Sequence, residues 1–191
     1  MAKEILELTK PDFVVEPCVG GGSLLKNMIP KVKGAMNDID DNHVENCRKI
    51  FDGYDWKFTA LDIVNNKTSA LIKAWGIPMG KRLLIYTNPP FGTTSTNRLA
   101  SKKGEMNGNV SRKQLIVIPL ELEKYGKGNL YLPIVGRFIE IAKRQKTAYL
   151  AFFSPFSLFC GRERHFKLLT ALLKDFRFIK GYVLLVTTFM I

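Results

Sequence analysis

The sequence has few residues that could form disulfides or bind a metal. Its three cysteines, Cys18, Cys47 and Cys160, are odd in number and lack the spacing of a metal site. We therefore expect reduced thiols in an intracellular, cytoplasmic protein, and no metal. No stretch of about 18 apolar residues is free of charge, and residues 1–9 alternate charged and apolar side chains. The sequence thus predicts neither a membrane span nor a signal peptide.

Acidic side chains and histidines are also scarce. There are 17 Asp and Glu against 29 Lys and Arg, and the formal net charge is +12. This balance favours a polyanionic partner, nucleic acid first and an anionic membrane surface second. A lysine-rich solvated surface is the alternative. The two histidines, His43 and His165, have no partner motif, so nothing indicates a Ser/His/Asp site or paired catalytic carboxylates.

Strand-like apolar runs alternate with helical patterns, which predicts an α/β fold in a single domain, 1–191. In the helix expected near 162–173, Phe166, Leu169 and Leu173 form the expected core-facing stripe. The sheet should be mostly parallel, with helices on both faces. Strands are expected near 12–16, 33–37, 56–61, 83–87, 148–153 and within 178–191, and helices near 3–9, 22–28, 41–51, 68–75, 131–144 and 162–173.

The most informative stretch is Thr87-Asn88-Pro89-Pro90-Phe91-Gly92, which follows an apolar strand. Open α/β sheets bind ligands at the carboxyl ends of their strands. The amide oxygen and a backbone carbonyl can accept both hydrogens of an exocyclic amine, and the ring can stack on a planar base. An ordinary turn would explain the two rigid prolines, but not the whole cluster.

A second motif, Glu16-Pro17-Cys18-Val19-Gly20-Gly21-Gly22-Ser23, follows the strand candidate 13–15. A glycine turn after a strand lets the backbone approach a nucleotide-like ligand closely. A carboxylate at the mouth of the turn is unfavourable for a phosphate. It is compatible with a cofactor that carries a positive sulfonium and an amino acid moiety.

The two motifs together resemble those of a known family. Glu16-Pro-x-x-Gly20-x-Gly22 is similar to motif I of S-adenosylmethionine-dependent amino-methyltransferases, and Asn88-Pro89-Pro90-Phe91 to motif IV of adenine-N6 methyltransferases. The resemblance covers roughly residues 4–153. It implies a Rossmann-like class I methyltransferase fold and S-adenosylmethionine as the cofactor. Its catalytic residues would be Asn88, Pro89, Pro90 and Phe91.

The same resemblance implies a cofactor site. Asp38 would bind the ribose, Ile39 would pack on the adenine ring, and Asp62 would contact the adenine amino group. As an isolated residue Asp62 would be a routine turn residue, and Asp40 is expected to cap the next helix. The family's Phe/Tyr-x-Thr-Pro-like element before motif I has no match here. The full set of implied cofactor contacts is Glu16, Pro17, Cys18, Gly20, Gly22, Asp38, Ile39, Asp62, Ile63 and Asn88.

Residues 93–114 carry almost no apolar periodicity, which predicts a long, basic, flexible loop. The segment contains several cationic residues but a single acid, Glu105, and it lies directly after the Asn-Pro-Pro-Phe cluster. These cations predict phosphate contacts, and a solvated mobile loop is the alternative. The five expected nucleic-acid contacts are Arg98, Lys102, Lys103, Arg112 and Lys113.

The first expected substrate is adenine in DNA, as for a restriction–modification or orphan methylase. Structured RNA and a protein glutamine amide are alternatives, and so is a cofactor-binding subunit that needs a partner for activity. Little sequence follows the fifth strand. We therefore expect a catalytic domain cut short at its ends, or one subunit of an enzyme whose specificity subunit or target-recognition domain is separate.

Overall fold

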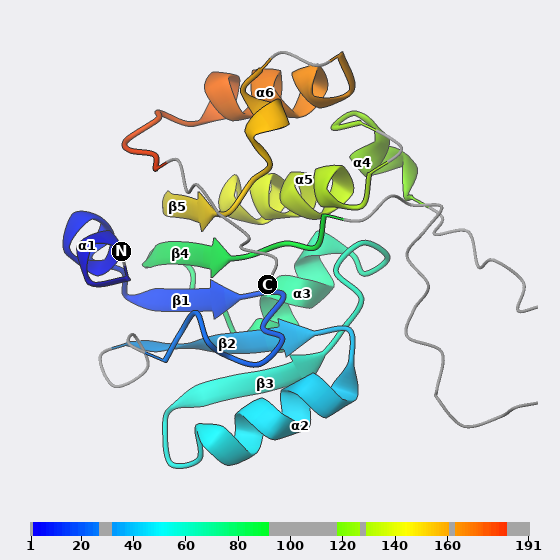
Figure 1. Ribbon diagram of the computed structural model, residues 1–191. Coiled ribbons are helices and arrows are strands. Elements are labelled where there is room, and N and C mark those ends of the chain that lie inside the picture. The colour runs from blue at the N-terminus through cyan, green and yellow to red at the C-terminus, as the bar shows by residue number, and fades with distance from the viewer. Residues whose placement is uncertain (1, 27–31, 92–117, 127–128, 161–162, 183–191) are drawn as a thin grey trace, which may run out of the picture.

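The computed structural model describes residues 2–26, 32–91, 118–126, 129–160 and 163–182 (Figure 1). Five strands form one sheet in the order β3-β2-β1-β4-β5, and every neighbouring pair is parallel. All the carboxyl ends therefore lie at the same edge. This confirms the predicted α/β class and is compatible with a Rossmann-like fold. The strands are β1 (Phe13–Glu16), β2 (Lys33–Asp38), β3 (Trp56–Ala60), β4 (Arg82–Thr87) and β5 (Thr147–Phe152).

Helices cover both faces of the sheet, because alternate strand side chains point to opposite sides. Val15 and Ile85 pack on the face that carries α3 and α5, whereas Val14 and Leu84 pack on the face that carries α1 and α2. The helices are α1 (Ala2–Thr9), α2 (Asp41–Ile50), α3 (Thr68–Trp75), α4 (Leu120–Glu123), α5 (Tyr131–Ala142) and α6 (Glu163–Asp175), with the 3-10 turn η2 (Phe156–Leu158).

The structure corrects two expected elements. Residues 21–26 form turns where a helix was expected over 22–28, and residues 27–31 lie outside the described part. Gly20 and Gly22 have φ values of 49° and 75°, which a right-handed helix cannot accommodate. The expected strand within 178–191 is not formed in its described part, residues 178–182.

The core-facing side of α6 also differs from the expectation. Leu168 is fully buried, whereas Phe166 and Leu173 are 61% and 64% exposed. Leu169, the third member of the expected stripe, is partly buried and packs against the core as predicted. Adjacent helical positions are separated by about 100° around the axis, so an inward face centred nearer Leu168 leaves Phe166 and Leu173 exposed. His165 is buried and its Nδ1 lies 3.1 Å from the carbonyl oxygen of Ser157, which ties α6 to η2.

The expected basic loop, 93–114, lies outside the described residues, and so do Arg98, Lys102, Lys103, Arg112 and Lys113. Their predicted phosphate contacts stay predictions. Within the described residues, no helix combines the length and apolar character needed to cross a membrane.

Candidate functional site

The sheet brings the predicted site residues to one edge. Glu16 ends β1 and Asp38 ends β2, while Asn88 directly follows β4. Because β1 lies between β2 and β4, with Glu16 beside Met36 and Val15 beside Ile85, the three carboxyl ends are neighbours. The glycine turn and the Asn-Pro-Pro-Phe cluster therefore occupy adjacent positions, as open parallel sheets require of a ligand site.

Glu16 is the most unusual residue of this edge. Its side chain is 1% exposed, and neither carboxylate oxygen has a hydrogen-bond partner among the described residues. Burial raises the pKa of this carboxyl well above its ordinary value, and the nearby charge of Asp38 raises it further. The Thr87 hydroxyl and the Asn88 backbone N–H oppose that shift without reaching hydrogen-bond geometry. A buried carboxylate in this state favours a cationic or hydrogen-bond-donating ligand.

Asp38 connects the glycine turn to the end of β2. The backbone N–H of Gly20 donates to its Oδ2 at 2.9 Å, and the N–H of Asp40 donates to its Oδ1 at 3.0 Å. Its side chain remains 14% exposed, with His43 Nδ1 3.5 Å from Oδ1. The adjacent Ile39 is 54% exposed. Asp38 thus has further acceptor capacity next to an accessible apolar surface, while its ribose contact stays a prediction.

The glycine turn has a fixed shape. At Gly22, whose φ is 75°, an added Cβ would lie 2.6 Å from Phe51 Cε2. The N–H of Val19 donates to the carbonyl oxygen of Asn37 at 2.8 Å.

Burial raises the pKa of the Cys18 thiol strongly, which keeps it protonated and disfavours a nucleophilic role for this residue.

Asn37 is a site residue that the sequence reasoning missed. Its side chain is fully buried, and its Nδ2 donates to the carbonyl oxygens of Pro17 at 3.1 Å and Leu61 at 3.0 Å. Its Oδ1 accepts from the Thr59 hydroxyl at 2.7 Å and the Leu61 N–H at 3.1 Å. One amide therefore fixes the ends of β1, β2 and β3 relative to each other. The available signal was an amide directly after the short apolar run Ala35-Met36, near the end of the strand.

Asp62 serves its own turn. Its Oδ1 accepts from the N–H groups of Val64 at 2.8 Å and Asn65 at 3.1 Å, and its Oδ2 accepts from Asn65 Nδ2 at 2.7 Å. This is the turn role that the sequence left open. The neighbouring Ile63 is buried in the core on the α3 and α5 face. The predicted contacts of both residues with the cofactor stay predictions.

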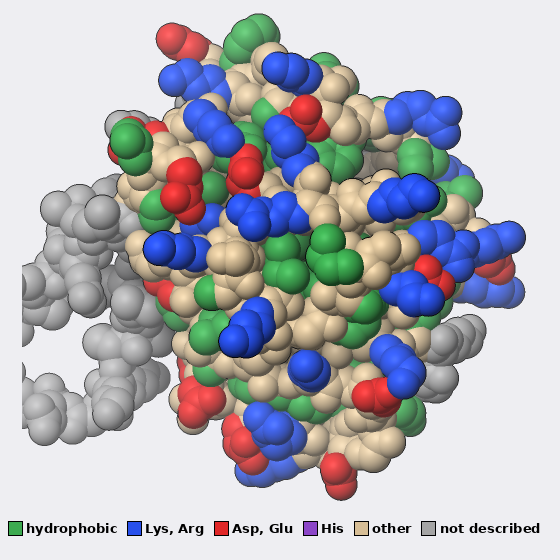
Figure 2. All heavy atoms as spheres, turned by 180° about the vertical axis from the view of Figure 1, so that it is seen from behind, with side chains coloured by type: hydrophobic (Ala, Val, Ile, Leu, Met, Phe, Trp, Pro, Cys, Tyr) green, Lys and Arg blue, Asp and Glu red, His purple; other side chains and the backbone are tan. Residues whose placement is uncertain are grey.

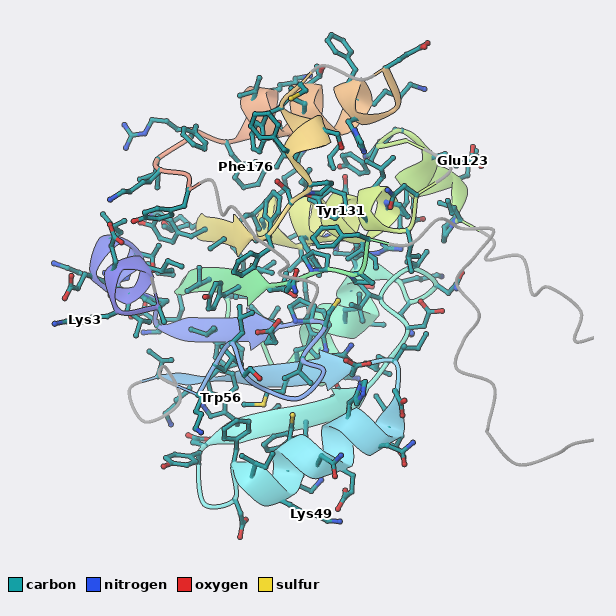
Figure 3. The ribbon with its side chains drawn as sticks, viewed as in Figure 1. Lys3, Lys49, Trp56, Glu123, Tyr131 and Phe176 are labelled. Atoms are coloured by element: carbon teal, nitrogen blue, oxygen red, sulfur yellow. The ribbon has the colours of Figure 1, made fainter. Side chains whose placement is uncertain are left out.

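The Asn-Pro-Pro-Phe cluster combines exposed and supported groups. Asn88 and Pro90 are exposed and Pro89 is buried. Phe91 is 47% exposed, and its ring centroid lies 5.6 Å from that of the fully buried Tyr131. The ring centroid of Tyr131 in turn lies 6.3 Å from that of Phe152. Figure 3 shows Tyr131 on α5, toward the carboxyl ends of the strands. One side of the Phe91 ring is thus packed on an aromatic stack, while part of it is free to stack on a ligand.

Charge and hollows elsewhere on the described surface do not indicate another obvious site. Figure 2 shows Lys and Arg spread over the back of the molecule and interleaved with Asp and Glu. The first of two hollows, about 340 Å³, is lined by residues of α5, β5 and α6 and their connections. The second, about 310 Å³, is lined by residues at the start of α3, in α4, and in and just after α5. Neither is lined by Glu16, Asp38 or Asn88.

No protein-family model, curated protein or solved structure matches this chain significantly. Function is therefore inferred from the residues at the carboxyl edge of the sheet and from the two sequence motifs.

Proposed function

We propose that this chain transfers a methyl group from S-adenosylmethionine to the N6 amino group of adenine in DNA. The observation that carries the proposal is the buried, unpaired Glu16 carboxylate beside Asn88 at the carboxyl edge of the sheet. A carboxylate in such a place destabilises the empty site unless a ligand compensates its charge. S-adenosylmethionine carries a sulfonium and an ammonium group, either of which could do so.

The remaining residues of the edge fit this cofactor. Asp38 retains acceptor capacity for the ribose hydroxyls, and the exposed Ile39 offers an apolar surface for the adenine ring. The glycine turn has no side chains that would keep its backbone away from the cofactor. When bound, S-adenosylmethionine supplies a methyl group that is susceptible to nucleophilic attack.

The Asn-Pro-Pro-Phe cluster would orient the accepting amine. The nitrogen lone pair of an adenine amine is delocalised into its ring. The Asn88 side-chain oxygen and the Pro89 carbonyl oxygen would accept its two hydrogens and favour a tetrahedral nitrogen, which is electrostatic preorganisation. In the proposed transfer the nitrogen would bond to the methyl carbon as the carbon–sulfur bond breaks, and the surplus N6 proton would leave to water. Phe91, supported by Tyr131, would stack on a base flipped out of the duplex.

Charge supports nucleic acid as the substrate class. The net charge of +12 and the basic segment after Phe91 favour DNA or RNA over a protein amide. Within that class, DNA is our first proposal and structured RNA the second. Target recognition would come from a specificity subunit or from a separate recognition domain.

The proposal is tested by incubating the chain with S-adenosylmethionine that carries a tritiated methyl group and, in parallel, duplex DNA, structured RNA and protein. We expect label in DNA. Label in RNA alone would show that the substrate is RNA and not DNA. Label in none, with cofactor bound, would indicate a subunit that requires a partner.

Asn88→Ala provides the residue-level test. Because the Asn88 side chain is exposed, we expect the variant to unfold at the wild-type temperature and to transfer no measurable label. Asn42→Ala, which removes an exposed amide on α2, is the matched control and should retain transfer. Wild-type turnover by Asn88→Ala would contradict the role assigned to this amide.

A further inference from the structure

Arg137 is a charged residue in the interior of α5. Its side chain is 1% exposed, and the sequence of α5 around it is largely apolar. All three guanidinium nitrogens donate hydrogen bonds. The acceptors are the Ile63 carbonyl oxygen at 3.2 Å, the Val64 carbonyl oxygen at 2.9 Å, the Thr68 hydroxyl at 2.8 Å and Glu121 Oε1 at 2.8 Å.

Most of these acceptors belong to a single short segment. Ile63 and Val64 lie between β3 and α3, and Thr68 is the first residue of α3; all three come about 70 positions before Arg137 in the chain. Transferring a guanidinium into the interior has a desolvation cost that an apolar side chain of similar size would not have. The four hydrogen bonds that Arg137 donates offset this cost, which indicates a role for its donors in addition to packing.

The turn after β3 is thereby held from two sides. On one side, the Asp62 carboxylate accepts from the N–H groups of Val64 and Asn65. On the other side, Arg137 donates to the carbonyl oxygens of Ile63 and Val64. The peptide groups of the turn are fixed in both their donors and their acceptors, which leaves its backbone little freedom.

We propose that Arg137 is a positioning residue. Its hydrogen bonds fix the backbone of the cofactor-binding turn 62–65, and it does not itself contact the cofactor. This inference rests on the proposed function, in which the turn bears on the adenine of S-adenosylmethionine. Binding strength then depends on how well the turn is preorganised. The same helix begins with Tyr131, which supports Phe91, so α5 fixes both the cofactor turn and the aromatic ring of the substrate cluster.

The planar fork of arginine is essential to this role. A guanidinium presents five N–H donors in a fixed plane and can bind several acceptors at once. A lysine ammonium keeps the charge but concentrates its donors at one point. Arg137→Lys should therefore release part of the turn while retaining a buried cation.

The test is calorimetric binding of S-adenosylhomocysteine, combined with steady-state kinetics. We expect Arg137→Lys to bind it on the order of tenfold more weakly than wild type, with a similar rise in the KM for S-adenosylmethionine. At saturating cofactor, kcat should stay within about twofold of wild type. A merely structural role would lower the unfolding temperature and the active fraction but leave the Kd of the folded fraction unchanged. An unchanged Kd would overturn the proposal.

Two further variants keep the proposal falsifiable if Arg137→Lys fails to fold. Thr68→Val removes one acceptor and leaves the arginine in place, so we expect binding to weaken by roughly two- to fivefold. Glu121→Gln changes only the half-exposed acceptor on α4 and should bind S-adenosylhomocysteine as wild type does. Wild-type binding by Thr68→Val, or equal weakening by Glu121→Gln, would contradict the proposed route through the turn. Failure of the wild-type chain to bind would instead overturn the proposed function, and this inference with it.

Discussion

Glu16 is a buried side chain whose charged form is disfavoured by that burial. Its pKa is raised above the ordinary value of 4.5, mainly by burial. Below pH 4.5 the carboxyl is protonated in both the folded and the unfolded chain. As the pH rises above 4.5, the unfolded chain releases this proton while the folded chain retains it, so stability falls until the folded pKa is passed.

Glu16→Gln removes this titration. Without ligand and at neutral pH, we expect the variant to exceed wild type in free energy of unfolding by about 1 kcal/mol or more. The difference should shrink as the pH falls toward 4.5. Urea unfolding at a series of pH values measures it, with Glu45→Gln on the exposed face of α2 as the control variant. A difference that is independent of pH would contradict the raised pKa assigned to Glu16 in the folded chain.

The structure shows why position 22 requires glycine. Its φ is 75°, and a Cβ there would collide with the Phe51 ring at 2.6 Å. Gly22→Ala should therefore lower the free energy of unfolding by about 1–3 kcal/mol. At Gly21 an added Cβ would meet nothing within 4 Å, so Gly21→Ala is the matched control and should change stability little. Equal losses in the two variants, measured by urea unfolding, would be inconsistent with the turn geometry.

At the scale of elements, a single amide joins the ends of three strands. Asn37→Asp is nearly isosteric but replaces the donating Nδ2 by an acceptor that faces the carbonyl oxygens of Pro17 and Leu61. We expect a loss of roughly 2–4 kcal/mol in free energy of unfolding. Thermal or urea unfolding checks it against Asn46→Asp on the exposed surface of α2, which should lose far less. Near-wild-type stability of Asn37→Asp would show that the strand ends do not depend on this amide.

The elements themselves follow largely from local sequence. The expected strand 83–87 and helix 68–75 are observed as Arg82–Thr87 and Thr68–Trp75, because apolar runs bounded by Gly and Pro carry a strong local signal. The core-facing stripe of α6 was correct for Leu169 but wrong for Phe166 and Leu173, because several registers of its leucines give plausible apolar stripes. Asn37 and Arg137 were missed because their importance comes from partners distant in the sequence, 20 to 24 positions away for Asn37 and up to 74 positions away for Arg137.

At the scale of the whole molecule, the net charge of +12 predicts that the proposed binding of nucleic acid weakens as the salt concentration rises. If Lys102 and Lys103 each neutralise one phosphate of duplex DNA, the double Lys→Gln variant should make the slope of log K against log salt less negative by about 1.8. Fluorescence anisotropy between low and physiological salt measures that slope.

A matched pair of charges controls for net charge alone. Lys3 on α1 and Lys49 in the last turn of α2 are both exposed. Both are labelled in Figure 3. Their double Lys→Gln variant changes the net charge equally and should leave the slope close to that of wild type. The same reduction in both variants would indicate that Lys102 and Lys103 have no special contact with phosphate.

The central claim concerns which atom receives the methyl group. DNA treated with the chain and S-adenosylmethionine can be digested to nucleosides and analysed by mass spectrometry. We predict that N6-methyldeoxyadenosine accumulates with the wild-type chain and is absent with Asn88→Ala. Methylation of cytosine instead, or equal N6-methyladenine formation by Asn88→Ala, would contradict the account.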